Sequence, residues 1–420
     1  MVALFSILRV AIDALREIIA SYQRVSRRIK QSPGLPVPSP TTPFWSIPAS
    51  PIQKEGSSAA LPTCADVVII GSGITGTAFA RTLLDLDGPL EVVMLEARDA
   101  CSGATARNRG HITPPLYHDY LDLKKKHGTE VAKQIIQFRL SHLDELISVA
   151  EEEGLIEESQ CRKVDTYDVY FDKGLWLGYE RWAGGYAARR RGERGHLDDG
   201  RCGASVSARG DIRAKHIVHA TNGWTSHLLA PMREKIVPVR GHMTAQRAGT
   251  GLDDGWPGTR SHPALRPSER NRMQSLCLAA ASRWAPSPSL TPSDVPTTAK
   301  SSFVCLHTLA AYFGKWWGSE SADEDENHFE KGRVKKAWSG VLGISADGLP
   351  WVGSLPSKVS GRPEGREWIA AGYSGEGMVH AWMSGKALTH MVLGKDIDWL
   401  LSPFRVTEKR WKKANIASLL

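Results

Sequence analysis

The feature that most constrains the fold is a glycine-rich stretch between an apolar run and a helical pattern. Residues 66–70 are mostly β-branched and apolar, which predicts a short buried parallel strand. A helical pattern runs from Thr75 to about Asp87, and a second short strand is expected over 91–95. The connection between the first strand and the helix reads Gly71-Ser72-Gly73-Ile74-Thr75-Gly76.

The three glycines of this connection each meet a geometric need. Gly71 permits the tight turn, Gly73 lets the backbone approach a pyrophosphate, and Gly76 lets the helix pack on the strand. The free N–H groups and the positive dipole at the helix start stabilise phosphate charge. Glu96 lies 20 residues after Gly76, at the end of the second strand, where a carboxylate accepts ribose hydroxyls. The spacing predicts a Rossmann-type α/β domain that binds a dinucleotide, either NAD(P) or FAD.

Four later segments resemble the D-amino-acid oxidase-like family of FAD-dependent oxidoreductases, and they come in that family's order. Residues 102–111 resemble its S-G-x-T-x-x-N-G-G stretch beside the flavin, and 220–224 resemble its turn near the adenylate. Residues 338–353 resemble its penultimate strands, and 371–378 its Gly-rich turn before the last flavin-domain helix. The resemblance is strongest to the branch with γ-glutamylputrescine oxidoreductase and fungal amine or amino-acid oxidases.

The resemblance implies FAD as the cofactor and oxidation of a C–N bond in an amine or amino acid. Hydride would pass to flavin N5, and molecular oxygen or another acceptor would reoxidise the ring. We expect non-covalent FAD because no cysteine follows Cys305, although a histidyl link stays open. Catalytic residues are not assigned, and no metal is expected. The residues expected at the cofactor are Gly71, Ser72, Gly73, Ile74, Thr75, Gly76, Glu96, Ala97, Arg98, Ser102, Gly103, Thr105, Asn108, Gly110, His111, Ala220, Thr221, Gly375, Gly377 and Met378.

Two alternatives to this interpretation stay open. One is a paralogue that binds FAD but is catalytically impaired because its substrate domain is degenerate. The other is an NAD(P)-dependent dehydrogenase that uses only the first βαβ unit, which would leave 102–111 and 371–378 unexplained.

The chain is predicted to divide into a cofactor half and a reduced substrate half. Residues 118–158 look helical and 164–171 look extended, whereas 184–213 and 249–300 hold little apolar pattern and no strong element. Arg109 stands where the related family usually has Gly. We therefore expect a discontinuous FAD-binding domain over 64–116, 205–240 and 335–396, and a partly irregular α+β substrate domain over 117–204 and 241–334.

The N-terminal 30 residues are predicted to form an amphipathic helix. Arg9, Asp13 and Arg16 share one narrow face with Ser6 and Glu17, and the rest is apolar. No run of ~18 uncharged apolar residues exists, so a spanning helix is not expected. Such a helix docks on protein or on a membrane surface through residues 1–20. A Pro-rich linker follows over 31–63.

Composition limits the binding partners and the cellular location that we expect for this chain. The net charge of +8 comes from short separated basic blocks without interleaved aromatics, so nucleic acid is not expected as a partner. Six scattered cysteines without a C-x-x-C pair argue against a zinc site or a disulfide scaffold. A cytoplasmic location is expected, with membrane association or an organelle left open.

Overall fold

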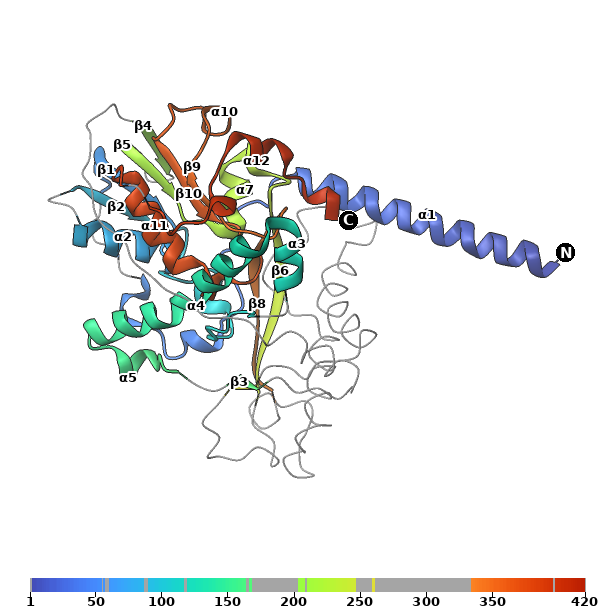
Figure 1. Cartoon of the computed structure of the whole chain (residues 1–420), viewed down its shortest axis with the longest axis horizontal. Coiled ribbons are helices and arrows are strands. Elements are labelled where there is room, and N and C mark those ends of the chain that lie inside the picture. The colour runs from blue at the N-terminus through green and yellow to red at the C-terminus, as the bar shows by residue number, and fades with distance from the viewer. Residues whose placement is uncertain are drawn as a thin grey trace, which may run out of the picture.

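A computed structural model describes most of the predicted cofactor half of the chain (Figure 1). Much of the predicted substrate domain, including all of 249–300 except Thr259 and Arg260, lies outside the described residues, and so does most of the strand expected over 164–171. The described residues are 2–54, 56, 60–86, 90–116, 119–163, 166–167, 203–207, 210–246, 259–260, 334–395 and 397–419.

The centre of the fold is a six-stranded sheet whose strands run mainly parallel. Four parallel strands lie in the order β2, β1, β5, β10, and β9 closes the far edge antiparallel to β10. β4 pairs antiparallel with β5 beside this path. This sheet confirms the predicted Rossmann-type α/β class. The strands are β1 (Cys64–Ile70), β2 (Val92–Leu95), β4 (Gly203–Ser207), β5 (Gly210–His219), β9 (Trp351–Ser354) and β10 (Glu367–Ala371).

Two helices that are far apart in sequence pack together on one face of this sheet (Figure 1). They are α2 (Ile74–Leu86), which follows β1 directly, and α11 (Ala381–Val392), which follows β10. Phe79 and Leu388 from these helices are fully buried in one core with Ile69 and Val218 from the strands. Burial of this apolar layer is the main term holding the helices on the sheet.

A long two-stranded ribbon leaves the main sheet, made of β6 (Ile236–Gln246) antiparallel to β8 (Val334–Ser345). A short parallel pair, β3 (Thr166–Tyr167) with β7 (Thr259–Arg260), forms the third sheet. The other helices and turns are α1 (Val2–Lys30), η1 (Phe44–Ser46), η2 (Pro51–Lys54), η3 (Ala104–Arg107), α3 (Tyr120–His127), α4 (Thr129–Glu152), α5 (Ile156–Ser159), η4 (Asn222–Trp224), α7 (Thr225–Leu228), η5 (Ala230–Met232), α10 (Ser357–Ser360), η7 (Gly377–Val379), η8 (Ser402–Phe404), α12 (Glu408–Lys413) and η9 (Ile416–Leu419).

The prediction that 184–213 holds no strong element was wrong at its C-terminal end. β4 and the start of β5 lie there and pair with each other from Gly203↔Ala214 to Ser207↔Gly210. In β5 the buried Ile212 and Ala214 alternate with the exposed charged residues Asp211 and Arg213. One face of this part of β5 is exposed, so charged residues alternate with apolar ones, and this charge content hides the strand in the sequence.

A helix, α1, covers the segment where the N-terminal helix is predicted, and the linker expected after it stays a prediction. No helix in the described part of the chain is long and apolar enough to cross a membrane. The segment after α1 contacts residues 107 and 108: Trp45 Nε1 donates to Asn108 O at 2.8 Å, and Arg107 Nη1 donates to Thr41 O at 2.7 Å.

Replacing Gly385 on α11 tests the contact between the two helices. A Cβ at Gly385 would lie 3.0 Å from Ala78 Cβ and would overlap Thr75 O on α2. We expect Gly385→Ala to lower the free energy of unfolding by about 1–3 kcal/mol in chemical denaturation. Gly56→Ala is the control, because a Cβ there meets no atom within 4 Å; its effect should stay below about 1 kcal/mol. Equal stability of the two variants would contradict the close helix contact.

Candidate functional site

The connection between β1 and α2 is packed so closely that its three glycine positions have no room for a side chain. Gly71 has φ +108°, and a Cβ there would lie 2.6 Å from Ala220 O at the end of β5. A Cβ on Gly73 would lie 2.8 Å from Thr105 Oγ1, and one on Gly76 would overlap the carbonyl oxygen of Gly71. Each of the three glycines therefore has a separate steric reason to lack a side chain.

Glu96 lies at the end of β2, beside the glycine loop, as its spacing predicts. Its Oε2 accepts hydrogen bonds from Ser72 N at 3.1 Å and Ser72 Oγ at 2.6 Å. Its Oε1 accepts from Ala97 N at 2.8 Å and Arg98 N at 3.3 Å. Ser72 Oγ also accepts from Cys101 N at 2.9 Å. These bonds join the loop, the acidic residue and the start of the next segment.

The 102–111 segment folds back on the start of α2. Thr105 Oγ1 accepts a hydrogen bond from Ile74 N at 3.1 Å, so it satisfies one of the free N–H groups at that helix start. Asn108 Nδ2 donates to Thr105 O at 2.8 Å, and Asn108 Oδ1 accepts from Gly110 N at 2.6 Å. The segment is thus held by its own polar side chains around η3.

Arg109 and His111 lie at the exposed end of this segment. Arg109, which departs from the related family's usual Gly, is exposed. Partial burial and the Arg109 charge lower the pKa of His111.

Two arginines near the loop, buried Arg107 and half-buried Arg98, differ in how well their donors are satisfied. Arg107 is 5% exposed and donates to Ser102 O and to Ser339 O, each at 2.8 Å. Burial and the nearby Arg98 charge lower the pKa of Arg107 to about 10, and burial also lowers the pKa of Arg98. Among the described residues, buried Arg98 Nη1 and Ser102 Oγ have no hydrogen-bond partner. A buried donor without a partner is costly, so each of these two atoms is a candidate contact for a bound ligand.

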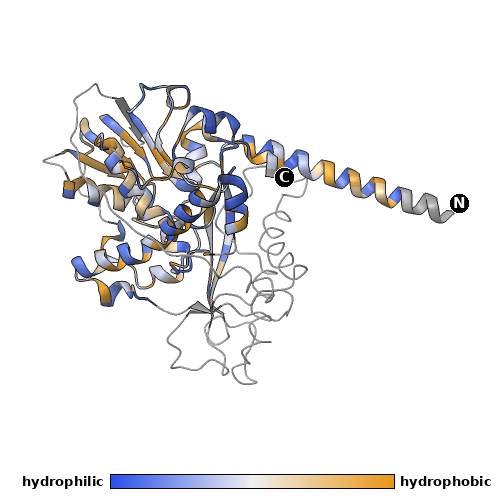
Figure 2. Ribbon diagram, viewed as in Figure 1, coloured by the Kyte–Doolittle hydropathy of each residue, from blue (hydrophilic) through white to orange (hydrophobic). Residues whose placement is uncertain are grey.

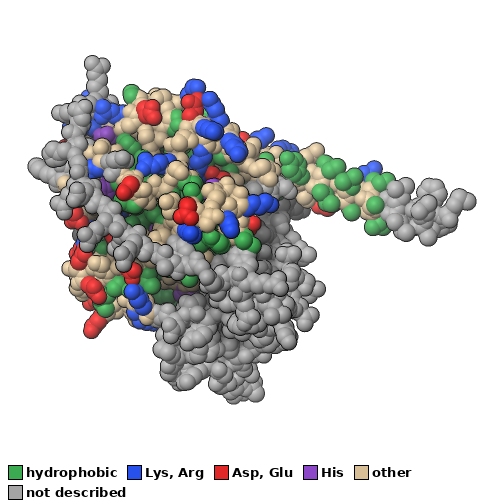
Figure 3. All heavy atoms as spheres, in the orientation of Figure 1, with side chains coloured by type: hydrophobic (Ala, Val, Ile, Leu, Met, Phe, Trp, Pro, Cys, Tyr) green, Lys and Arg blue, Asp and Glu red, His purple; other side chains and the backbone are tan. Residues whose placement is uncertain are grey.

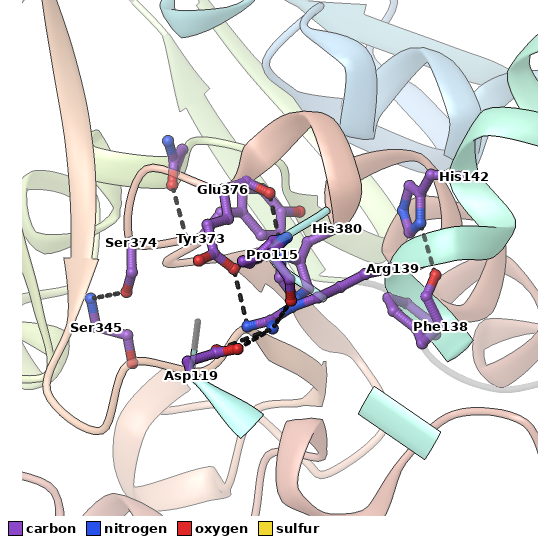
Figure 4. A network of polar contacts seen from close by, with 11 residues as sticks. Pro115, Asp119, Phe138, Arg139, His142, Ser345, Tyr373, Ser374, Glu376 and His380 are labelled. Atoms are coloured by element: carbon purple, nitrogen blue, oxygen red, sulfur yellow. Dashed lines mark hydrogen bonds and ion pairs between the residues drawn. The ribbon is translucent and has the colours of Figure 1, made fainter. Parts of the chain in front are cut away.

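The C-terminal glycine turn over 372–377 is bonded to three distant segments. Asn222 Oδ1 accepts from Gly372 N at 3.1 Å and from Tyr373 N at 3.4 Å. Ser374 Oγ accepts from Ser345 N on β8 at 3.0 Å, a contact visible in Figure 4. The buried Tyr373 hydroxyl and Thr75 Oγ1 are 2.7 Å apart, which ties the turn to the first turn of α2.

The same turn is held from its other side by Arg139 on α4 (Figure 4). The Arg139 side chain is 3% exposed, and its Nη2 pairs with Glu376 Oε2 at 2.9 Å. Its Nη1 donates to both carboxylate oxygens of Asp119, at 2.9 and 3.0 Å, and to Pro115 O at 3.4 Å. Burial raises the pKa of Glu376, although Arg139 acts in the opposite direction. Two carboxylates surround this one guanidinium, so its donors are well satisfied.

Two buried neutral histidines extend the network towards α11 (Figure 4). His380 Nδ1–H donates to Glu376 O at 2.9 Å, and burial together with the Arg139 charge holds the pKa of His380 well below its usual value. His142 Nδ1–H donates to Phe138 O at 2.9 Å, and its Nε2 accepts from Met383 N at 3.2 Å. Burial lowers the pKa of His142 to about 4. In the described part of the chain, no group of three or more His, Cys, Asp or Glu residues is arranged to hold a metal ion.

The structure brings most of the predicted site residues to one edge of the sheet, where β1, β2 and β5 end. The turn with Gly375, Gly377 and half-buried Met378 reaches this edge through the contact between Tyr373 and Thr75. Thr221, also predicted at the cofactor, forms a hydrogen bond with Thr225: their Oγ1 atoms are 2.9 Å apart. Whether these residues hold a cofactor stays a prediction.

Sequence reasoning missed Arg107, Tyr373 and the group around Arg139. Arg139 has no local signal, since one charged residue on an amphipathic helix is usually exposed. Asn222 was noted only as part of a turn, although its φ of +39° marks a special backbone position.

The fold is the FAD-binding fold of a flavoprotein family. A family model described as FAD dependent oxidoreductase matches residues 66–201 and 189–391, and the chain belongs to this family. No curated protein sequence matches the chain.

Solved structures of low sequence identity share the fold. An L-amino acid deaminase from Proteus vulgaris is 15% identical with a TM-score of 0.53, covering 86% of this chain and 98% of its own. Glycine oxidase from Geobacillus kaustophilus is 16% identical with a TM-score of 0.54, covering 83% and 99%. L-proline dehydrogenase from P. horikoshii is 14% identical with a TM-score of 0.52, covering 84% and 99%.

The neutral state of His142 predicts a pH-dependent stability. Its folded pKa lies below the unfolded value of about 6.5, so the unfolded chain takes up the proton first as pH falls. The contribution of neutral His142 to the free energy of unfolding is therefore fully present above pH ~6.5 and is lost as pH falls towards ~4. At pH ~5 the loss is about 2 kcal/mol. In denaturant titrations, His142→Gln should reduce the difference in the free energy of unfolding between pH ~7.5 and pH ~5 by this amount. An unchanged pH dependence in the variant would contradict the buried neutral histidine.

Proposed function

We propose that this chain is an FAD-dependent oxidoreductase that oxidises a C–N bond of an amine or amino acid, with hydride passing to flavin N5. The observation that carries the proposal is the convergence of the glycine loop, the 102–111 segment and the 372–377 turn at one edge of the sheet. Membership of the FAD dependent oxidoreductase family supports the cofactor and the reaction class.

The residues at this edge fit a dinucleotide that carries a pyrophosphate. The three glycines of the loop stand where side chains would collide with neighbouring protein atoms, and such a loop at a helix start favours phosphate. The unpartnered donors Arg98 Nη1 and Ser102 Oγ suit phosphate or ribose oxygens. Glu96 is exposed and already accepts from Ser72, so its carboxylate would bind ribose hydroxyls by exchanging these bonds. The proposed cofactor set is that expected from the sequence.

The chain's own contribution to the reaction is mainly orientation. Bound flavin would supply the hydride acceptor, and hydride transfer needs a fixed geometry more than it needs acid–base groups. The bonds from Asn222, Ser345 and Arg139 fix the 372–377 turn, and Tyr373 fixes that turn relative to α2. Gly375 and Gly377 in this turn are proposed to lie against the flavin, as the resemblance implies. We propose non-covalent attachment, because no cysteine follows Cys305.

The proposed substrate is a small amine or amino acid, and the proposed acceptor is molecular oxygen or another oxidant. The names of the solved structures that share the fold, an amino acid deaminase, a glycine oxidase and a proline dehydrogenase, support this class. The residues that would choose among such substrates fall in the predicted substrate domain, largely outside the described residues.

An anaerobic amine panel tests the proposed function. Purified protein should be yellow, and at least one primary or secondary amine or amino acid should bleach its visible flavin absorbance in the absence of oxygen. The matched alcohol or hydroxy acid should not bleach it. A colourless protein that reduces NAD(P) would favour the dehydrogenase alternative. A yellow protein that no amine bleaches would favour the catalytically impaired paralogue.

A further inference from the structure

A long apolar stripe on α1 is exposed and plays no part in the site. Val10 is 69% exposed, Leu15 56% and Ile18 65%. The helix projects from the body of the molecule as a rod (Figure 1), and apolar residues recur along the part of it that is coloured by hydropathy (Figure 2). The space-filling view shows hydrophobic side chains on the surface of that part of the rod (Figure 3). The remaining exposed apolar residues of the stripe are Ile12, Ile19, Tyr22 and Val25.

The inner end of the same stripe is already used for packing. Ile29 follows Val25 by four positions, so it lies on the same side of the helix. Ile29 is buried in a core with Met232 and Ile416 from the body. The body thus covers the apolar side of the helix at its last turn and leaves the preceding turns exposed. An exposed apolar surface of this length indicates that a partner or a membrane covers it.

The polar side of α1 is basic. Between residues 9 and 30 the helix holds six basic and two acidic residues, a net charge of +4. Both acidic residues are already paired: Asp13 with Arg16 at 3.3 Å, and Glu17 with Arg24 at 3.0 Å. The excess positive charge complements a surface of negative charge. The basic residues are Arg9, Arg16, Arg24, Arg27, Arg28 and Lys30.

The width of the stripe distinguishes between two coverings: a second copy of the helix and a lipid surface. Leu15, Ile18, Tyr22 and Val25 follow the spacing of a coiled-coil seam, so a second copy could pair along them. Ile12 and Ile19, however, occupy flanking positions where a two-stranded coiled coil normally carries charges that select its partner. Self-pairing would leave these exposed and bring two helices of charge +4 together. A flat lipid surface covers a wide stripe and attracts the charge.

We propose that α1 lies in the plane of an anionic lipid bilayer surface, with its apolar stripe among the acyl chains and its basic side at the headgroup phosphates. The helix would then hold the flavin-binding body at the membrane through the junction at Ile29. An interfacial position agrees with the finding that no described helix is long and apolar enough to cross the bilayer. The proposal does not depend on the reaction that the body catalyses.

Vesicle sedimentation of the full chain tests this proposal. The protein should pellet with phosphatidylcholine–phosphatidylserine vesicles, pellet poorly with pure phosphatidylcholine vesicles, and dissociate as salt rises. Ile18→Glu should weaken binding to the anionic vesicles at least about tenfold, since it places a charge in the stripe. Gln23→Glu is the matched control: it makes the same charge change at an exposed position towards the polar side, and its binding should stay within about threefold.

Three results would overturn the proposal. One is failure of the unaltered chain to pellet with the anionic vesicles, and another is equal binding by the two variants. The third is self-association in sedimentation velocity without lipid that Ile18→Glu abolishes, because a second copy would then cover the stripe. Circular dichroism and thermal unfolding of both variants show whether each remains folded, so that weak binding by Ile18→Glu is not a loss of the fold.

Discussion

The close contact between Gly76 and the carbonyl group of Gly71 leaves no room for a side chain and fixes the start of α2 against β1. This contact lets α2 begin directly at the end of β1 and sets the position of its first turn. Thr105 bonds to Ile74 in that turn, and Tyr373 bonds to Thr75. Segments separated by hundreds of residues are therefore positioned against one helix start. The free N–H groups and dipole of that helix start are what make it suitable for phosphate.

Arg139 and Arg98 differ in whether their charge is paired within the protein. Arg139 is surrounded by the carboxylates of Asp119 and Glu376, and such a pair offsets the cost of burying charge. Its role is to hold the 372–377 turn in place. Arg98, in contrast, keeps a buried donor without a partner, beside a second buried guanidinium on Arg107. An incompletely satisfied positive charge next to a phosphate-type loop is expected where an anionic ligand completes the site.

The parts of the fold that could be predicted are those indicated by the spacing of residues within a short segment. The strand, glycine loop, helix, strand and Glu96 all fall within a short stretch, and α1 follows its helical periodicity. The start of β5 was missed because a half-exposed strand with alternating charged residues looks like a loop until its partner is known, and β4, which pairs with it, consists mostly of small residues. The network of Arg139 could not be predicted because it depends on which helix faces the 372–377 turn, a long-range property. The predicted substrate domain lies largely outside the described residues, so its boundaries stay a prediction.

Titration of FAD into the apoprotein tests whether the glycine loop holds the cofactor. Gly76→Ala places a methyl group against Gly71 O, whereas Gly56→Ala adds one in open space outside the proposed site. Both variants carry the same chemical change. We predict that Gly56→Ala binds FAD like the unaltered chain and that Gly76→Ala binds at least about 100-fold more weakly, or about 2.8 kcal/mol. Equal FAD affinity for the two variants would contradict the proposed role of the loop.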